Sequence, residues 1–288
     1  MDSALLLILN GSALCSKNKD IPMNYENIKL EYRDRIAILH FDRMPVMNSL
    51  SVEMAKEVLN ALENIQQNQN ISALIITAEG KGFCSGAELS PQSFLGDGQA
   101  SPAQSLEHHM QHYFNIWIEK IENFPIPVVV AMNGIAAGAG VGIALASDIT
   151  IAAEEAYFIL TFAPKLNLIP DMGTSWFLPH FIGTARSKAI TLLGEKITAK
   201  QAEQWGLIWK CVPKIELFDE ALKIANQLAK LPPDIAQHVR KTYAHADTHS
   251  LPEQLNYEKE LQCQLVQTPA FMEGVAAFIE RREPIFKR

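Results

Sequence analysis

The 288-residue sequence predicts an α/β fold in which strands and helices alternate first and helices alone follow. Apolar, β-branched runs at residues 71–77 and 128–130 are typical of buried parallel strands. Each run is followed by a turn of small residues, at 80–89 and 133–142, before a helical pattern begins. Beyond about residue 184 the apolar spacing is helical almost throughout.

A β-hairpin and a capped helix are expected to open the fold. Residues 28–33 and 36–41 alternate polar and apolar side chains, which predicts the two strands of the hairpin. Residues 48–51, Asn-Ser-Leu-Ser, can cap a helix that continues to about residue 67, because apolar residues then recur at helical spacing.

The stretch from residue 127 to residue 158 has the plan strand, glycine-rich turn, helix and strand. Its small residues allow a ligand oxygen to approach unpaired backbone N–H groups where the helix begins. Before it, residues 90–103 are rich in Gly, Pro, Ser and Gln and are expected to form a mobile loop. A helix is expected over residues 104–123.

The carboxy-terminal part is predicted to be helical, with a short strand at residues 208–212. The expected helices are 184–194, 198–205, 216–229, 233–247, 251–267 and 270–282. We therefore expect a poorly ordered extension over residues 1–24, a β/α core over 25–200 and a helical region over 201–288.

Composition narrows the classes of function. The formal net charge of −7 and the absence of a basic block disfavour binding to nucleic acid or to an anionic membrane. The longest amino-terminal apolar run, residues 4–9, is too short to span a bilayer, and no basic residue precedes it as in a signal peptide. The cysteines are far apart without metal-site spacing, so we expect reduced thiols and a cytoplasmic location.

The small-residue turns suit two ligands. Gly138, Gly140 and Gly142 give G-x-G-x-G, an imperfect match to a dinucleotide-binding turn, and no further strand–helix series follows. Alternatively, the turns at residues 85–87 and 138–140 each follow an apolar strand and can aim one N–H at a common point, as in an oxyanion hole. From the residues alone, an oxyanion hole and two ordinary tight turns both remain open.

Four motifs occur in a characteristic order. Residues 43–50 read R-M-P-V-M-N-S-L, residues 82–89 read G-F-C-S-G-A-E-L, residues 133–140 read N-G-I-A-A-G-A-G, and residues 169–176 read I-P-D-M-G-T-S-W. Together they resemble the crotonase (enoyl-CoA hydratase/isomerase) superfamily along roughly residues 25–288.

The resemblance implies a β-β-α spiral core, a helical region that builds homotrimers or hexamers, and an acyl-CoA thioester as the bound molecule. It implies no metal and no separate cofactor, because coenzyme A is part of the substrate. The oxyanion donors would be the amides of Ala87 and Ala139, and Ser85, Ala87 and Leu89 would contact coenzyme A. Lys287, in the basic carboxy-terminal end, would contact its phosphates; the alternative is that this end only complements a helix dipole.

The resemblance also bears on the reaction. Hydratases of the superfamily use two glutamates, which would fall at Gly142 and at Phe162 or Ala163, and none of these residues can move a proton. Asp171 matches the acid/base of enoyl-CoA isomerases, and its turn also resembles those of phenylacetate-pathway isomerases and of dehalogenases with a nucleophilic aspartate.

We therefore expect Asp171 to shift the double bond of a 3-enoyl-CoA, a reaction of the kind used in fatty acid metabolism. Apolar sequence neighbours are expected to raise the pKa of its carboxyl group. The alternatives are that Asp171 is only a helix cap, and that the chain is a hydratase, a dehalogenase, a hydrolase or a non-catalytic acyl-CoA-binding protein.

Several conspicuous residues are expected to be structural. Glu88 stands at the position of a structural aspartate in the superfamily, and Cys84 is expected to be a small packing residue without a histidine partner. His108 and His112 have the spacing of a zinc pair, but a solvated helix face is the simpler interpretation. Phe162 is expected to line the acyl pocket or to pack in the core.

Overall fold

The computed structural model describes residues 24–89 and 101–287. Nearly all of the expected poorly ordered extension (1–24) and most of the expected mobile loop (90–103) lie outside these ranges. None of the helices in the described part of the chain is both long enough and apolar enough to cross a bilayer.

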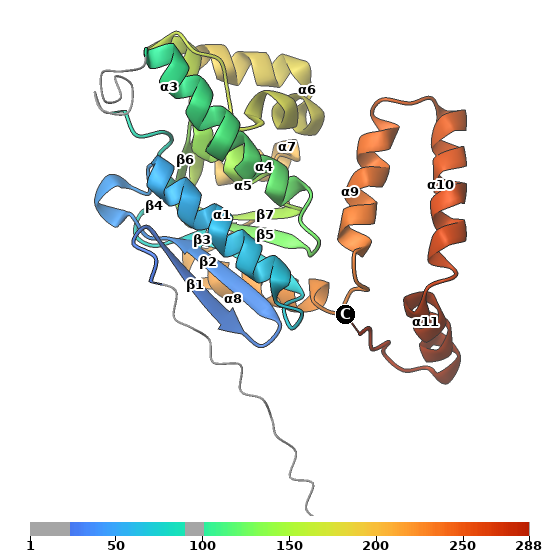
Figure 1. The fold of residues 1–288 in the computed structure, drawn as a ribbon. Coiled ribbons are helices and arrows are strands. Elements are labelled where there is room, and N and C mark those ends of the chain that lie inside the picture. Colours follow the sequence, from blue (N-terminus) through green and yellow to red (C-terminus); the bar gives the residue numbers. More distant parts are fainter. Residues whose placement is uncertain (1–23, 90–100, 288) are drawn as a thin grey trace, which may run out of the picture.

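A six-stranded sheet forms one layer of the molecule (Figure 1). Its strands, in spatial order, are β1 (Ile28–Arg33), β2 (Ile36–Phe41), β3 (Ala73–Ala78), β5 (Val128–Met132), β7 (Ile149–Ala153) and β10 (Lys210–Val212). β1 and β2 form the predicted antiparallel hairpin, and the other pairs are parallel. Every residue of β3 and β5 is buried, as expected for the central strands of a parallel sheet.

A second, four-stranded sheet consists of strands of only two or three residues. They are β4 (Gly82–Cys84), β6 (Ile135–Ala137), β8 (Tyr157–Ile159) and β9 (Ile197–Thr198). Each of the first three follows directly after a strand of the large sheet, in the pairs β3–β4, β5–β6 and β7–β8, and a helix comes next. The chain therefore repeats a β-β-α unit three times, and the spiral implied by the motifs is confirmed.

Helices cover both faces of the large sheet. The α-helices in the described part of the chain are α1 (Val52–Gln67), α3 (Pro102–His109), α4 (Asn115–Glu122), α5 (Ala139–Leu145), α6 (Thr174–Leu193), α7 (Ala199–Trp205), α8 (Leu217–Leu228), α9 (Ile235–Ala246), α10 (Leu251–Leu265) and α11 (Pro269–Glu280). α3 and α4 are joined by a π-helical turn, Met110–Phe114, so the predicted helix over 104–123 is confirmed. α8 packs on β3 and β5, on the face opposite α1 and α4 (Figure 1).

Two polar residues just before α1, Asn48 and Ser51, have different structural roles. Ser51 is the N-cap, and its side chain accepts a hydrogen bond from the backbone N–H of Met54. Asn48 is fully buried and does not cap the helix. Its amide nitrogen donates to the carbonyl oxygens of Glu79 and Gly82, at 3.0 and 2.8 Å, and so fixes the start of β4.

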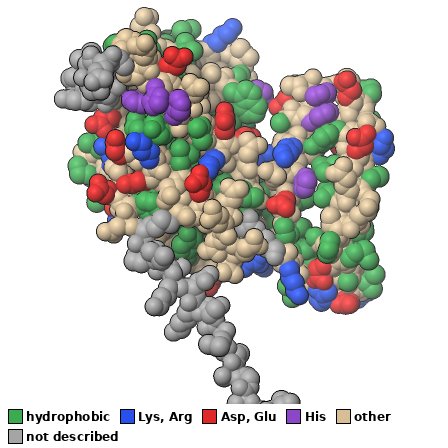
Figure 2. All heavy atoms as spheres, in the orientation of Figure 1, with side chains coloured by type: hydrophobic (Ala, Val, Ile, Leu, Met, Phe, Trp, Pro, Cys, Tyr) green, Lys and Arg blue, Asp and Glu red, His purple; other side chains and the backbone are tan. Residues whose placement is uncertain are grey.

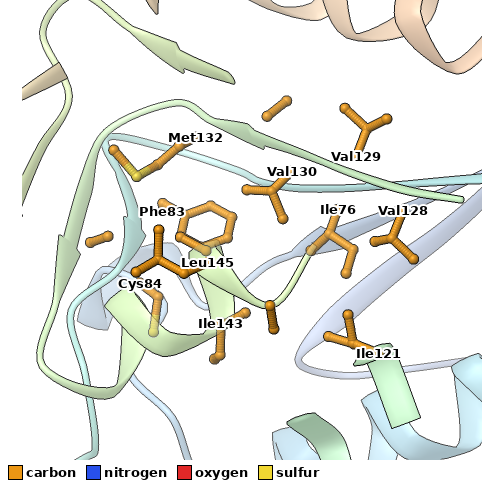
Figure 3. Close-up of a cluster of buried hydrophobic side chains, with 14 of the residues drawn as sticks. Ile76, Phe83, Cys84, Ile121, Val128, Val129, Val130, Met132, Ile143 and Leu145 are labelled. Carbon is orange, nitrogen blue, oxygen red and sulfur yellow. The ribbon is translucent and has the colours of Figure 1, made fainter. Parts of the chain in front are cut away.

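Apolar side chains from both sheets and from α5 fill one continuous core (Figure 3). Phe83 and Cys84 of β4 point into it, together with Ile76 of β3, Val130 of β5 and Leu145 of α5, and all five are at most 1% exposed. Because β4 and α5 are anchored by this core, the turn after β4 and the first residues of α5 are held rigidly.

The last three helices extend away from the sheets (Figure 1). The boundary expected at residue 200 falls within α7, whereas β10 belongs to the large sheet and α8 packs on it. The region that extends away begins only at α9. Figure 2 shows apolar side chains gathered at its far end, where Met272, Phe278 and Ile279 of α11 are 62–85% exposed.

Arg240 of α9 attaches this region to the core. Its guanidinium group donates to both carboxylate oxygens of Asp148, at 2.6 Å each, and to the carbonyl oxygens of Glu122, Phe124 and Ile126. The Arg240 side chain is 12% exposed and that of Asp148 is 20% exposed. Asp148 also accepts a hydrogen bond from the backbone of Val128, so one ion pair connects α9 with the start of β5.

We expect Arg240→Ala to lower the free energy of unfolding by about 2–3 kcal/mol, because it removes a partly exposed ion pair together with the hydrogen bonds to three backbone carbonyl oxygens. Chemical denaturation at fixed protein concentration measures this. The control is Lys223→Ala, which removes an exposed ion pair and is expected to change the value by less than about 0.5 kcal/mol. Equal effects of the two substitutions would contradict the anchoring role.

Candidate active site

The two small-residue turns meet because β4 and β6 are parallel neighbours. Gly82 pairs with Ile135 and Cys84 pairs with Ala136, so both strands end at the same edge of the small sheet. A methyl group built on Gly86 would lie 2.9 Å from the carbonyl oxygen of Ala137. The turns therefore touch, as two turns that present amides to a common point must.

Backbone conformation favours glycine at both turns, and at Gly86 the available space requires it as well. Gly86 has φ of +95° and Gly138 has φ of +51°, values that side-chain-bearing residues rarely adopt. In each case the next residue, Ala87 or Ala139, carries one of the two amides expected to bind the thioester oxygen. Ala139 is only 3% exposed, so its methyl group is accommodated where relatives are expected to have glycine.

Both amides are available as donors. Leu50 forms a parallel bridge with Ala87, in which the N–H of Leu50 donates to Gly86 and the N–H of Glu88 donates to Leu50, at 2.8 and 2.9 Å. In this pattern the N–H of Ala87 points to the other side. Ala139 is the first residue of α5, so its N–H has no acceptor within the helix. Within residues 24–89 and 101–287, neither N–H donates a hydrogen bond to the protein.

Asp171 carries the most perturbed carboxyl group near the turns. Burial raises the pKa of its side chain to about 6. Its Oδ1 atom is buried and has no hydrogen-bond partner within the described ranges. The predicted rise of the Asp171 pKa is confirmed.

Asp171 does not cap the following helix. The N-cap of α6 is Gly173, and no side chain accepts a hydrogen bond there. Only the backbone carbonyl of Asp171 is used, as acceptor for the N–H of Thr174 at 2.9 Å. The capping interpretation of Asp171 is therefore wrong, and a buried carboxyl oxygen without a partner among the described residues calls for another explanation.

The turn that contains Asp171 packs on α5, the helix that begins at one of the amide-bearing turns. The carbonyl oxygen of the next residue, Met172, packs on α5 at Gly142, where an added methyl carbon would lie only 2.1 Å from it. Gly142 lies about one helical turn beyond Ala139. On the other side, the ring of Phe162 lies 3.6 Å from a methyl group built on Gly138. One small region thus holds the two amides, an aromatic wall and the turn that contains Asp171.

The positions of the two hydratase glutamates cannot supply a carboxylate. At Gly142 the Met172 carbonyl leaves no room for any side chain. Phe162 is 6% exposed and begins a π-helical turn, Phe162–Leu166, that also contains Ala163. Within the described ranges, Glu122 is the only other carboxylic acid with a clearly raised pKa, and it lies at the end of α4 near Arg240.

Ser85 and Leu89 lie on the turn after β4, as expected. The Ser85 N–H donates to the carbonyl of Met47 at 3.1 Å, and its hydroxyl donates to that of Val46 at 3.1 Å. These bonds hold the turn against the 3₁₀ segment Met44–Val46. Leu89, the last residue described before the gap, is 57% exposed and available for contact.

Lys287 is not brought to this site within one chain. Its neighbour Phe286 lines a small cavity with Arg35, Ser72 and Pro125, at the amino-terminal ends of β2, β3 and β5. The amide-bearing turns follow the carboxyl-terminal ends of β3 and β5, at the opposite edge of the sheet. A contact between Lys287 and the same bound molecule would therefore have to come from another subunit.

The other conspicuous residues have structural surroundings. Glu88 forms an ion pair with Arg43 at 2.9 Å, which supports its expected structural role. Cys84 is fully buried, and burial raises the pKa of its thiol to about 12, so it is an unreactive packing residue. The rings of His108 and His112 stack at 4.2 Å. No group of three metal-binding side chains occurs in the part of the chain that the structure describes.

Sequence reasoning missed two residues that build this site. Leu50 and Asn48 belong to a recognised motif, yet Leu50 acts through its backbone, which leaves the Ala87 amide free, and Asn48 acts by fixing β4. Their only sequence signal was the motif at residues 43–50, which carries no geometry by itself.

Comparison with known proteins agrees with this geometry. The Enoyl-CoA hydratase/isomerase family model matches residues 31–288. The chain is 35% identical over 251 residues to the 1,2-epoxyphenylacetyl-CoA isomerase of Escherichia coli, covering 87% of this chain and 94% of that protein. It is 37% identical over 264 residues to a probable enoyl-CoA hydratase of Rhodobacter capsulatus, covering 92% and 99%.

A solved structure shows the same fold. The enoyl-CoA hydratase of Bacillus anthracis superposes with a TM-score of 0.81 at 32% identity, covering 91% of this chain and 99% of that one. The spiral of β-β-α units, the paired turns and the family match lead to one conclusion: the chain belongs to the enoyl-CoA hydratase/isomerase family and has the crotonase fold.

Proposed function

We propose that the protein is an enoyl-CoA isomerase that converts a 3-enoyl-CoA into the conjugated 2-enoyl-CoA. The Asp171 carboxylate removes a proton from C2, and the electron pair passes into a dienolate. The negative charge on the thioester oxygen is stabilised by the amides of Ala87 and Ala139. Asp171, now protonated, returns the proton at C4, the C2–C3 double bond forms, and the carboxylate is regenerated.

The observation that supports this proposal most strongly is the unpaired, buried carboxyl oxygen of Asp171. A pKa of about 6 suits a group that must both accept and return a proton near neutral pH. An allylic shift needs one mobile proton carrier, whereas hydration needs a second group to hold the water. The hydratase alternative is disfavoured because Gly142 and Phe162 provide no such group.

A second candidate concerns the acyl group. The relative from Escherichia coli named 1,2-epoxyphenylacetyl-CoA isomerase is 35% identical to this chain over 251 residues. A ring-derived CoA thioester is therefore the alternative substrate class, with the same aspartate and amides acting on it. Parallel assays with 3-enoyl-CoA and 1,2-epoxyphenylacetyl-CoA distinguish the two classes.

We also propose the ligand and the ligand contacts that the sequence motifs imply. Coenzyme A is part of the substrate, and the chemistry needs no metal and no further cofactor. Ser85, Ala87 and Leu89 would contact the coenzyme A moiety at the turn after β4, and Lys287 of another subunit would contact its phosphates. We propose that the protein is located in the cytoplasm.

We also propose that the chain forms homotrimers or hexamers. α9 and α10 leave Val239, Tyr243 and Leu255 47–72% exposed along a groove of about 560 Å³. A second groove of about 850 Å³ lies at α11 and includes Phe278, which is 85% exposed. Apolar surface of this extent supports self-association. Analytical ultracentrifugation tests it, and a monomer at micromolar concentration would contradict it.

The pH dependence of the reaction tests the role of Asp171. The base must be ionised in the free enzyme, so kcat/KM for a 3-enoyl-CoA is expected to rise with pH and to level off above a midpoint near 6. The conjugated thioester is followed by its absorbance between pH 4.5 and 8.5. A midpoint near 4, the value of an exposed aspartate, or a flat profile would contradict the proposal.

A further inference from the structure

The turn that carries Asp171 has a constrained backbone. The hydrogen bond from Thr174 N–H to the Asp171 carbonyl closes a four-residue turn. Its two central residues, Met172 and Gly173, have φ of +50° and +76°. Positive φ at both positions is the requirement of a type I′ turn, in which Asn-Gly or Gly-Gly is usual. Methionine adopts this conformation only where its surroundings impose it.

Two contacts impose it here. The Met172 side chain is 4% exposed and is part of the hydrophobic core. The Met172 carbonyl lies on the bare backbone of α5 at Gly142, where an added methyl carbon would be 2.1 Å from that oxygen and 2.8 Å from the Thr174 hydroxyl. Thr174 is fully buried, so the turn cannot easily move away.

The same helix therefore serves both halves of the site. α5 presents the Ala139 amide at its first residue and seats the Asp171 turn about one helical turn later, at Gly142. The spacing between the Ala139 amide and the Asp171 turn is set by a fully buried helix.

We propose that Gly142 and Met172 are positioning residues that fix the Asp171 turn, so that the buried Oδ1 atom of Asp171 keeps no protein partner and faces the acyl group. This inference rests on the proposed function, because it assumes that Asp171 carries the proton. The inference also explains why residue 142 is a glycine: the Asp171 turn occupies the space that a side chain would need. A carboxylate at 142 and this turn exclude each other in the present backbone.

The test is Gly142→Ala compared with Lys223→Ala, a substitution by the same residue at an exposed position of α8. We expect Gly142→Ala to lower kcat for 3-enoyl-CoA roughly 100-fold, because a displacement of about 1 Å has this effect on a reacting group. KM is expected to change less than about threefold, and the midpoint of the pH profile to move away from 6. Lys223→Ala is expected to retain the wild-type values.

Substitution of Met172 tests the contribution of its buried side chain. It also provides an independent test if Gly142→Ala does not fold. Met172→Gly removes the buried side chain while permitting the same backbone, so the turn is released. We expect kcat to fall at least about tenfold, KM to be retained and the pH midpoint to move. Met172→Leu keeps an apolar side chain of similar volume and is expected to restore most of the activity.

Wild-type kcat and an unmoved pH midpoint in both Gly142→Ala and Met172→Gly would overturn the inference. A crystal structure of Gly142→Ala decides without turnover: a displaced Asp171 turn supports the inference, and an unmoved turn contradicts it. Failure of the proposed function is recognised separately, because Asp171→Asn would then be as active as the wild type.

Discussion

Asp171→Asn is expected to lower kcat for the isomerisation of a 3-enoyl-CoA by a factor of about 10³ or more, with KM changed less than about threefold. The amide has the size of the carboxyl group but cannot accept the C2 proton, and general base catalysis contributes on the order of 10²–10⁴ in rate. The residual rate is that of the oxyanion hole alone. Initial rates measured by the absorbance of the conjugated thioester give both constants.

The matched control is Asp219→Asn on α8, an exposed residue that packs against no part of the site. It is expected to have wild-type activity. A wild-type kcat in Asp171→Asn would mean that another group carries the proton, and the proposed mechanism would then be wrong.

Asp171→Asn is also expected to be more stable than the wild type at neutral pH. Burial raises the folded-state pKa of Asp171 to about 6, above its unfolded value, so the ionised carboxylate destabilises the fold once the pH exceeds both values. Removing it is expected to raise the free energy of unfolding at pH 8 by on the order of 2 kcal/mol. The gain should decline as the pH falls through 6 and vanish below about 4. Urea denaturation at pH 8 and pH 4 shows whether it does.

Ala139→Pro is expected to lower kcat by about 10²–10³, the usual effect of removing one oxyanion-hole donor. Ala139 is the first residue of α5, a position at which proline fits the helix and removes only an N–H that no described acceptor uses. KM for the CoA thioester is expected to change less than kcat, because the lost hydrogen bond is strongest when the oxygen is an enolate.

Leu251→Pro is the control for the effect of proline itself. Leu251 is the first residue of α10, is 71% exposed, and follows Ser250 in an extended conformation that proline permits. It should retain full activity with 3-enoyl-CoA. If Ala139→Pro folds, as judged by circular dichroism, and also keeps wild-type kcat, the Ala139 amide is not an oxyanion donor.

The large sheet could be predicted from sequence, and the small one could not. β1, β2, β3 and β5 are runs of five or six residues with clear apolar patterns. β4, β6 and β8 have three residues each, too few for a period of two to be recognised. From the sequence, β4 and β6 were interpreted as parts of turns, and β8 was not predicted. β4 and β6 bring the turns together, because their parallel pairing makes neighbours of residues that are 52 or 53 positions apart, Cys84 with Ala136 and Gly82 with Ile135.

The candidate site shows a similar division. Asp171, Ala87 and Ala139 could be named from motifs, and apolar neighbours predicted the direction of the Asp171 pKa shift. The sequence left open whether Asp171 caps its helix, because that depends on where its side chain points. The Met172 carbonyl packs on Gly142, which is a contact between α5 and the turn before α6. No local sequence pattern predicts a contact between these two segments.

The most direct test compares two reactions on one enzyme preparation. Purified protein is given a short 3-enoyl-CoA and, separately, the corresponding 2-enoyl-CoA, and products are separated by liquid chromatography. The account predicts rapid conjugation of the 3-enoyl-CoA and hydration of the 2-enoyl-CoA that is slower by a factor of at least about 10³, since only one carboxylate serves the site. Hydration as fast as conjugation would contradict it and would show that a second group holds the water.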